Sequence, residues 1–185
     1  KNLGKHLSYI NNSSARNVAV TKETRTGAAR PRSLLVVYNP VAGWRRPGLL
    51  EQVVAALEAA GASVVIRRTA TRGDAEGFAR AARDEGYDRL LVAGGDGTIN
   101  EAVNALAGSA LPLAIVPMGT ANVLATEIGL AAEARAIADT ALEGPVARIA
   151  LGQVNNRRFT LMAGVGFDAE VVRSVDPGVK QRLGK

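Results

Sequence analysis

The chain has 185 residues, of which 47% are hydrophobic and 22% charged, a composition typical of a globular protein. It contains no Cys, which excludes a disulfide framework, thiol catalysis and any cysteine-ligated metal centre. The net charge of +6 belongs to one end, because residues 1–33 carry seven Lys and Arg against one Glu, whereas residues 34–185 carry 16 charges of each sign. The body is therefore electrically balanced, and we expect no nucleic-acid partner.

Residues 1–32 differ from the rest in being polar and basic. They offer little apolar surface to offset the entropy of ordering, so we expect a loosely held, disordered tail. The tail lacks the apolar segment of a signal peptide. The uncharged stretch at residues 102–126 contains two prolines and several polar residues, which would interrupt a membrane-spanning helix. These features predict a cytoplasmic protein without a transmembrane segment.

From Ser33 onward, apolar runs of strand length alternate with segments of helical periodicity. The runs predict buried strands at residues 34–38, 63–68, 89–93 and 113–116. Apolar residues at helical spacing predict helices near residues 49–57, 74–83, 99–106, 123–128 and 131–142. This alternation predicts a Rossmann-like α/β domain over residues 33–144, with a parallel sheet and helices on both of its faces.

The alternation of strand-length runs with helical segments ends near Pro145. Apolar runs at residues 146–151 and 158–162 flank the pair Asn155-Asn156, which is typical of a tight hairpin turn. We therefore expect residues 145–185 to be the beginning of a second, β-rich domain that is incomplete in this chain.

Four loops follow the carboxyl ends of the predicted strands, at residues 39–43, 69–74, 94–98 and 117–122. In an open parallel sheet the ligand binds beyond these ends. Each loop contains glycine or small hydroxyl or amide residues, and helices that begin at such loops attract anions to their N-termini. The sequence thus predicts an anion site at this edge, and phosphate is the expected anion.

The most informative loop reads Gly94-Gly95-Asp96-Gly97-Thr98-Ile99-Asn100-Glu101. It is neither a Walker loop nor a Gly-x-Gly-x-x-Gly motif. Its glycines are compatible with a plain turn in which Asp96 merely caps the following helix. A carboxylate among phosphate-binding amides is, however, unfavourable unless a cation or a proton offsets it. We therefore favour the interpretation that Asp96 meets metal-bound phosphate or a hydroxyl group.

This octet, followed by Ala102-Val103-Asn104, resembles the nucleotide-binding motif of the diacylglycerol kinase catalytic domain family. That family includes bacterial lipid kinases and sphingosine kinases, and it shares its Gly-Gly-Asp-Gly core with NAD kinases. The other family loops match in order, at Asn39-Pro40-Val41-Ala42-Gly43, at Thr69 with Gly73-Asp74-Ala75, and at Pro117-Met118-Gly119-Thr120-Ala121-Asn122. The segment from Gly164 to Ala169 is similar to the entrance of the family's second domain.

The resemblance implies an ATP-dependent kinase that uses Mg²⁺ and transfers the γ-phosphate to a lipid hydroxyl of the diacylglycerol or sphingoid-base type. It implies Asp96 as the central catalytic acid and Asp168 as a contact to the lipid head group. The implied nucleotide-binding residues are Asn39, Pro40, Gly43, Thr69, Gly94, Gly95, Asp96, Gly97, Thr98, Ile99, Asn100, Glu101, Gly119 and Thr120. The implied partners are the nucleotide and, by transient contact with the inner membrane face, the lipid. The oligomeric state stays open.

Two departures from the family pattern matter. Many members have Asn-Asp where this chain has Asn122-Val123. The family's general base and metal-site residues lie later in the second domain, past Lys185, so the metal ligands are unknown and we expect the chain alone to be incomplete for catalysis. Two other functions stay open: an NAD kinase-like small-molecule kinase, and a nucleotide-binding module without catalysis.

Two basic clusters follow the first and second strands. The cluster Trp44-Arg45-Arg46 is suited to anionic phosphate or a membrane surface, but we favour a solvated loop. The pair Arg67-Arg68 is equally compatible with phosphate binding and with an exposed strand end.

Overall fold

The computed structural model describes residues 32–42, 46–164, 166, 170 and 174. Its elements follow the alternation that the sequence predicts. In chain order they are β1 (Ser33–Tyr38), α1 (Leu49–Ala59), β2 (Ser63–Arg68), α2 (Asp74–Asp84), β3 (Arg89–Gly94), α3 (Asp96–Leu106), β4 (Leu113–Pro117), α4 (Val123–Glu127), α5 (Ala134–Glu143), β5 (Gly152–Val154) and β6 (Arg157–Phe159). Apart from Arg32, the expected tail lies outside the described residues.

Four strands form a parallel sheet in the order β2-β1-β3-β4, which confirms the predicted α/β architecture. The two central strands are the most deeply buried. In β1 the run from Leu34 to Val37 is completely inaccessible to solvent, and β3 is buried from Arg89 to Gly94. Both faces of these strands exclude water, which explains why their sequences are continuous apolar runs and do not alternate with polar residues.

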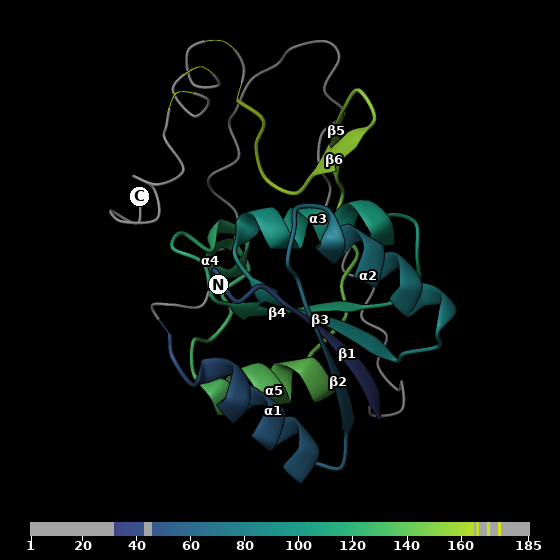
Figure 1. Ribbon diagram of the computed structural model, residues 1–185, viewed down its shortest axis with the longest axis vertical. Helices are drawn as coiled ribbons and strands as arrows, with labels where there is room; N and C mark the ends of the chain where they lie inside the picture. Colours follow the sequence, from purple (N-terminus) through teal and green to yellow (C-terminus); the bar gives the residue numbers. More distant parts are fainter. Residues whose placement is uncertain (1–31, 43–45, 165, 167–169, 171–173, 175–185) are drawn as a thin grey trace, which may run out of the picture.

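Alternate side chains of the central strands enter two separate cores. Leu34, Val36 and Leu91 pack with residues of α1 and α5. Leu35 and Val37 pack with residues of α2, α3 and α4 on the opposite face. Figure 1 shows this division, with α1 and α5 below the sheet and α2 and α3 above it. Because helices cover both faces, a ligand can approach the sheet only at its edges or at the ends of its strands.

A buried arginine joins the start of β3 to the end of α5. Arg89 is 9% exposed, and its Nη1 atom donates hydrogen bonds to the carbonyl oxygens of Thr140 and Ala141. These carbonyls lie in the last turn of α5, where the negative end of the helix dipole makes positive charge favourable. The Thr140 carbonyl also accepts the N–H of Gly144, the residue after the helix (2.9 Å). Burial lowers the pKa of Arg89, but a guanidinium remains charged in proteins. Arg89 therefore holds α5 against the sheet.

Strands β5 and β6 form an antiparallel hairpin around Asn155-Asn156, as the sequence predicts. Asn155 has a φ of 51°, the left-handed conformation that such a turn requires. The apolar run at residues 146–151, which is predicted to lead into this turn, does not form the first strand of the hairpin, because that strand begins only at Gly152. Pairing within the hairpin ends at Gly152 and Phe159, because the chain bends at the next two residues, Thr160 and Leu161. Residues 146–151 therefore form no continuous strand, and Arg148 is a single bridge residue among them.

The hairpin lies above α3 in Figure 1, and polar contacts connect it to α2 and α3. The side-chain amide of Asn104 in α3 donates to the backbone carbonyl of Arg158 (2.9 Å) and accepts its N–H (2.8 Å). The Arg157 guanidinium forms an ion pair with Glu76 of α2 at 2.7 Å. Asn104 thus pairs with β6 in both directions, as a neighbouring strand would.

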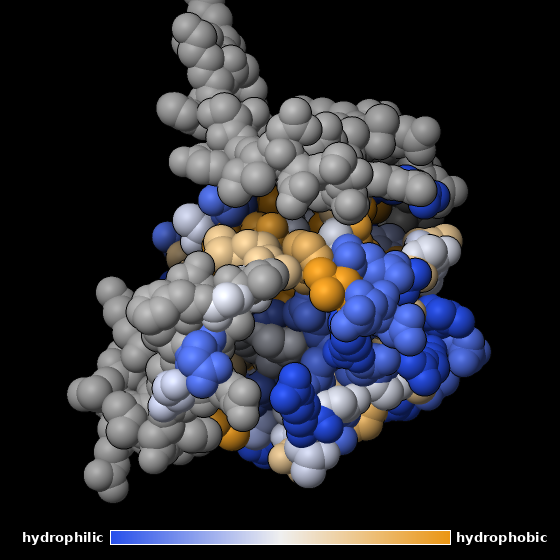
Figure 2. Space-filling view, turned by 90° about the horizontal axis from the view of Figure 1, so that it is seen from above, coloured by the Kyte–Doolittle hydropathy of each residue, from blue (hydrophilic) through white to orange (hydrophobic). Residues whose placement is uncertain are grey.

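Several exposed apolar side chains lie in or directly after the hairpin, namely Val154, Leu161 and Met162. Figure 2, viewed from above the hairpin, shows hydrophobic surface beside a larger hydrophilic area. Throughout the part of the chain that the structure describes, every helix is too short or too polar to cross a bilayer.

Asp88 anchors the start of β1. Its Oδ2 atom accepts N–H groups from Ser33 and Arg32, both at 2.9 Å, and these bonds hold the pKa of the Asp88 carboxyl below its usual value. A lowered folded-state pKa stabilises the fold above the unfolded-state pKa of about 3.9. This stabilisation is lost as the pH falls through the folded-state pKa.

We therefore expect Asp88→Asn to lower the free energy of unfolding at pH 7 by less than about 1 kcal/mol, since solvent screens this exposed site. The variant should also lose less stability than the wild type on acidification. Urea denaturation at several pH values measures both effects. The matched control is Asp84→Asn, which removes the same charge from an exposed position. Coincident stability curves for the two variants would contradict the role given to Asp88.

Candidate functional site

The carboxyl ends of β1 and β3 form the centre of the candidate site. The chain leaves β1 toward α1 on one face of the sheet and leaves β3 toward α3 on the other, so the strand order reverses here. Asn39, the residue after β1, joins the two loops. Its backbone N–H donates to the carbonyl of Ala93 (2.8 Å), and its Nδ2 atom donates to Thr98 Oγ1 (2.9 Å).

The same asparagine shapes its own loop. Asn39 Oδ1 accepts the N–H of Val41 (3.1 Å), and the Asn39 carbonyl accepts the N–H of Ala42 (3.2 Å). The half-buried Pro40 lies inside this turn, where its fixed φ favours the bend. The amide of Asn39 is therefore occupied on both sides by protein groups. Gly43, which closes the motif, lies outside the described residues.

The loop after β3 leads directly into α3. A Cβ on Gly94 would lie 2.7 Å from the Cβ of Thr98, so only glycine fits beneath that side chain. Gly95 is the N-cap residue, and no side chain caps α3. The N–H groups of the first helical turn are therefore available to an anion, and the helix dipole favours negative charge at this end.

The loop after β4 lies against this helix start, backbone to backbone. A Cβ on Gly119 would lie 2.6 Å from Gly95 Cα and 2.9 Å from Asn122 Oδ1. Asn122 folds the loop from within, because its side chain accepts the N–H of Gly119 and donates to its carbonyl, both at 2.7 Å. Asn122 itself adopts the left-handed conformation, with a φ of 48°, which asparagine tolerates better than most residues.

Asp96 does not cap its own helix, so the plain-turn alternative is wrong in that form. Asp96 is the first residue of α3, and its Oδ1 atom accepts a long hydrogen bond of 3.4 Å from the N–H of Leu124 in α4. Within the described part of the chain this is the one hydrogen bond that its carboxylate makes, so Oδ2 has no partner there. The acid lies between α3 and α4 with one oxygen available to a ligand.

The loop after β2 is built around Asp74. Its carboxylate accepts the N–H groups of Thr71 (2.8 Å) and Ala70 (2.7 Å) and the Thr71 hydroxyl, and these bonds lower the pKa of Asp74. Thr69 connects the loop to β1 by donating its N–H to the carbonyl of Tyr38 (2.8 Å). Glu101 of α3 accepts the N–H of Gly73 (3.0 Å). This carboxylate therefore ties the β2 loop to the helix of the Gly94–Glu101 motif.

The residues predicted to bind nucleotide differ in accessibility. Thr98 and Ile99 are buried, so their side chains contribute to the packing of the loop. Gly97 and Thr120 are exposed, and a Cβ on Gly97 would meet no atom within 4 Å. Asn100 has a buried Oδ1 atom without a partner among the described residues. Asp168, the predicted lipid contact, lies outside them.

For Arg46, the structure contradicts the interpretation of Trp44-Arg45-Arg46 as a solvated loop. It is half-buried, and its Nη1 atom donates to the carbonyl of Pro117 at the end of β4 (3.2 Å). Together with Gly119, Thr120 and other residues of the β4 loop and α4, it lines a pocket of about 360 Å³. No local sequence signal predicts this contact, since the two residues are 71 positions apart. Trp44 and Arg45 lie outside the described residues.

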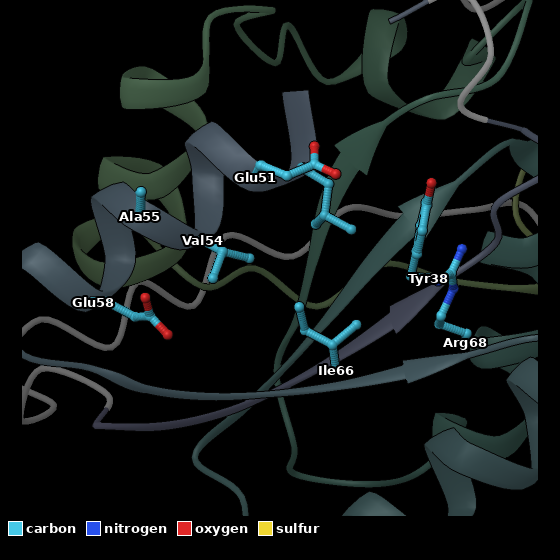
Figure 3. Close-up of a pocket in the computed structure, with 8 residues that line it drawn as sticks. Tyr38, Glu51, Val54, Ala55, Glu58, Ile66 and Arg68 are labelled. Atoms are coloured by element: carbon cyan, nitrogen blue, oxygen red, sulfur yellow. The ribbon is translucent and has the colours of Figure 1, made fainter. Parts of the chain in front are cut away.

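A second pocket, of about 400 Å³, lies between α1 and the edge strand β2 (Figure 3). Tyr38 and Arg68 are at one end of it, with the Arg68 guanidinium 5.5 Å from the ring centroid. Glu51 and Glu58 of α1 also line it, and their charges disfavour phosphate. This pocket contains none of the predicted nucleotide-binding residues. Arg67 points to the other face, where it pairs with Glu85 at 2.7 Å.

Comparison with known proteins identifies the family. Residues 33–154 match the family model of the diacylglycerol kinase catalytic domain. The chain belongs to that family. This confirms the resemblance seen in its motifs, and it makes the chain part of a lipid kinase family.

Relatives and solved structures agree with this assignment. The chain is 36% identical over 156 residues to a diacylglycerol kinase of Bacillus subtilis, an alignment that covers 81% of this chain and 51% of the relative. It is 35% identical over 158 residues to a Pseudomonas fluorescens protein named "Probable lipid kinase YegS-like", covering 83% and 50%. A crystal structure of a diacylglycerol kinase from Bacillus anthracis superposes with a TM-score of 0.52 at 32% identity, covering 60% of this chain and 39% of that one. The chain thus spans about half the length of the curated relatives that it matches.

The close contact between Gly119 and Gly95 predicts that an alanine at position 119 destabilises the fold. An alanine at position 97, which lies in open space, should not. Gly119→Ala forces the two loops apart and should lower the free energy of unfolding by about 1–3 kcal/mol. Gly97→Ala, the matched control, adds a methyl group in open space at the start of α3. It should leave stability unchanged or raise it by up to about 1 kcal/mol. Urea denaturation of the natural full-length protein measures both, and equal stabilities of the two variants would rule out the backbone contact.

Proposed function

We propose that this chain is the nucleotide-binding part of an ATP-dependent lipid kinase, which transfers the γ-phosphate of ATP to a lipid hydroxyl of the diacylglycerol or sphingoid-base type. Membership of the family supports a phosphotransferase with a lipid acceptor. The observation that carries the proposal is the meeting of the loops after β1, β3 and β4 around the uncapped start of α3. Phosphoryl transfer depends mainly on positioning and charge stabilisation, and backbone N–H groups held in this way supply both.

In this proposal the backbone of the Gly94–Asn100 segment binds the phosphates. Gly97 leaves space for a ligand to reach the start of α3, because no atom lies within 4 Å of its Cβ position. Thr120 adds an exposed hydroxyl from the neighbouring loop, and the half-buried Thr69 adds a hydroxyl from the loop after β2. The side chains of Asn39 and Thr98 hydrogen-bond to each other, so we assign them to holding the loop in shape.

Mg²⁺ suits the donor set as a partner of the nucleotide. The described residues contain no group of three or more His, Cys, Asp or Glu side chains suited to a metal. Mg²⁺, however, commonly takes one or two carboxylates together with phosphate oxygens and water. Asp96 has a carboxylate oxygen that no described residue contacts by a hydrogen bond. Asp96 and the nucleotide would hold the ion, which neutralises charge on the phosphates. The further metal ligands and the general base belong, in this proposal, to the protein outside this chain.

The lipid acceptor requires contact with a membrane. We propose that the protein is cytoplasmic and meets its lipid by transient contact with the inner membrane face. Residues 34–185 carry equal numbers of positive and negative charges, so their electrostatic adsorption to an anionic surface is weak. Weak adsorption suits an enzyme that must leave the membrane after each transfer.

The direct test incubates the natural full-length protein with γ-labelled ATP, Mg²⁺ and either diacylglycerol or sphingosine in mixed micelles, with NAD in a parallel reaction. Labelled phospholipid is the expected product. Faster labelling of NAD than of either lipid would favour the NAD kinase-like alternative. ATP binding without any labelled product would favour a binding module without catalysis.

Two substitutions of Asp96 separate its charge from its contact with α4. Asp96→Asn keeps an oxygen that accepts the Leu124 N–H but removes the charge, whereas Asp96→Ala removes both. If the charge acts on metal-bound phosphate, both variants should lose turnover by about 10²-fold or more in the full-length kinase. The melting temperature should fall only for Asp96→Ala, because that variant alone loses the hydrogen bond.

A role limited to capping α4 gives a different result. Asparagine caps helices about as well as aspartate, so Asp96→Asn would then keep turnover and stability near those of the wild type. Steady-state kinetics and thermal denaturation of the two variants decide between these roles. Wild-type turnover of Asp96→Asn would remove Asp96 from the chemistry.

A further inference from the structure

The pocket beside the β4 loop contains a cation that has no ionic partner among the described residues. Arg46 is the charged residue among those that line the pocket, whose other members are neutral. Its recorded interaction within the described part of the chain is the hydrogen bond from Nη1 to the Pro117 carbonyl. A guanidinium has five N–H donors. This contact uses one of them, so the guanidinium is anchored, and its other donors and its charge have no partner in the part of the chain that the structure describes.

The neighbouring polar groups show where the remaining donors would be used. The amide of Asn122 is occupied by Gly119 on both sides, and the Thr126 hydroxyl donates to the carbonyl of Asn122 (3.0 Å). The Thr120 hydroxyl makes no hydrogen bond to the described residues and is exposed. Arg46 and Thr120 are thus the uncommitted polar groups beside a floor of Ala125 and Leu130.

A purely structural role does not explain an arginine at this position. A single neutral donor would satisfy the Pro117 carbonyl, whereas a half-buried cation loses hydration that no carboxylate in the pocket restores. An anion would restore it. The guanidinium is planar and forked, which matches the oxygens of a phosphate group, and charge-assisted bonds of this kind are among the strongest in proteins.

We propose that Arg46 binds a phosphate group, and that this phosphate belongs to the nucleotide. The inference rests on the proposed function, because the pocket shares Gly119 and Thr120 with the loop assigned to nucleotide binding. Gly119 in turn lies against Gly95 at the start of α3. Arg46 therefore brings the loop before α1 to the phosphates, and it adds a cation to a site whose other assigned residues are neutral or acidic.

The test compares ATP binding by four forms of the natural full-length protein in the absence of lipid. Arg46→Gln keeps an N–H donor for the Pro117 carbonyl but removes the charge, and Arg46→Lys keeps the charge but removes the fork. Arg135→Gln is the matched control, because Arg135 on α5 is 74% exposed and pairs only with Asp139 among the described residues. Calorimetric titration at two salt concentrations gives the Kd and its salt dependence, and thermal denaturation without ligand reports on folding.

For Arg46→Gln we expect a Kd for ATP raised about tenfold or more, a weaker dependence of that Kd on salt, and an unchanged melting temperature. Arg46→Lys should recover part of the affinity, and Arg135→Gln should bind like the wild type. An Arg46→Gln affinity within about twofold of that of Arg135→Gln would overturn the proposal. A loss of affinity with an unchanged salt dependence would also overturn it, because the effect would then be structural.

Failure of the proposed function gives a different pattern. If the wild type binds no ATP, the nucleotide assignment is wrong whatever Arg46 does. The same four proteins are therefore also tested with inorganic phosphate and with phosphatidylcholine vesicles that contain or lack phosphatidic acid. Binding to either probe that Arg46→Gln abolishes would support a phosphate site and assign it to free phosphate or to a lipid head group. Binding that no Arg46 variant changes, or no binding at all, would refute it.

Discussion

Burial of β1 and β3 on both faces is the constraint from which the rest of the molecule follows. Two adjacent strands that exclude water on both sides need helices above and below them. The chain meets this need by placing α1 and α5 on one face and α2 and α3 on the other, which reverses the strand order between β1 and β3. The carboxyl ends of these two strands then open onto loops that run to opposite faces. The candidate site is thus a geometric consequence of how the core is covered.

Asparagine side chains hold two loops of the site, those after β1 and β4. Asn39 links the β1 loop to Thr98, and Asn122 closes the β4 loop on Gly119. An amide both donates and accepts, so it can replace a missing backbone partner without adding charge. The site therefore keeps its backbone N–H groups and the charge of Asp96 for a ligand. The close approach of Gly95 and Gly119 has the same effect, because it joins two loops without occupying any polar group.

The predictable features are those that depend on local periodicity. Apolar runs and helical spacing located the strands and helices, since burial on a regular element repeats every two or about four residues. The positions of the site's loops could be predicted from the ends of the strands, and the residues assigned to ligand binding came from the family resemblance. Contacts across the fold were not predictable: Arg46 meets Pro117 and Asp96 meets Leu124 through tertiary packing that no local pattern encodes. The apolar run at residues 146–151 forms no continuous strand for a related reason, because β-propensity depends on the neighbouring strands that the fold supplies.

One helix connects the candidate phosphate site to the hairpin that follows the α/β domain. Helix α3 begins at Asp96 and holds β6 through Asn104, eight residues later, which is about 12 Å along the helix axis. An α-helix of this length is nearly rigid, and α3 is buried against the sheet over most of its turns. Its N-terminus and its hairpin-binding face therefore cannot move independently. The end of the hairpin is therefore held at a fixed distance and in a fixed direction relative to Asp96. In the proposed kinase the acceptor must be aligned with the phosphates, and this fixed position would remove one source of misalignment before any substrate binds.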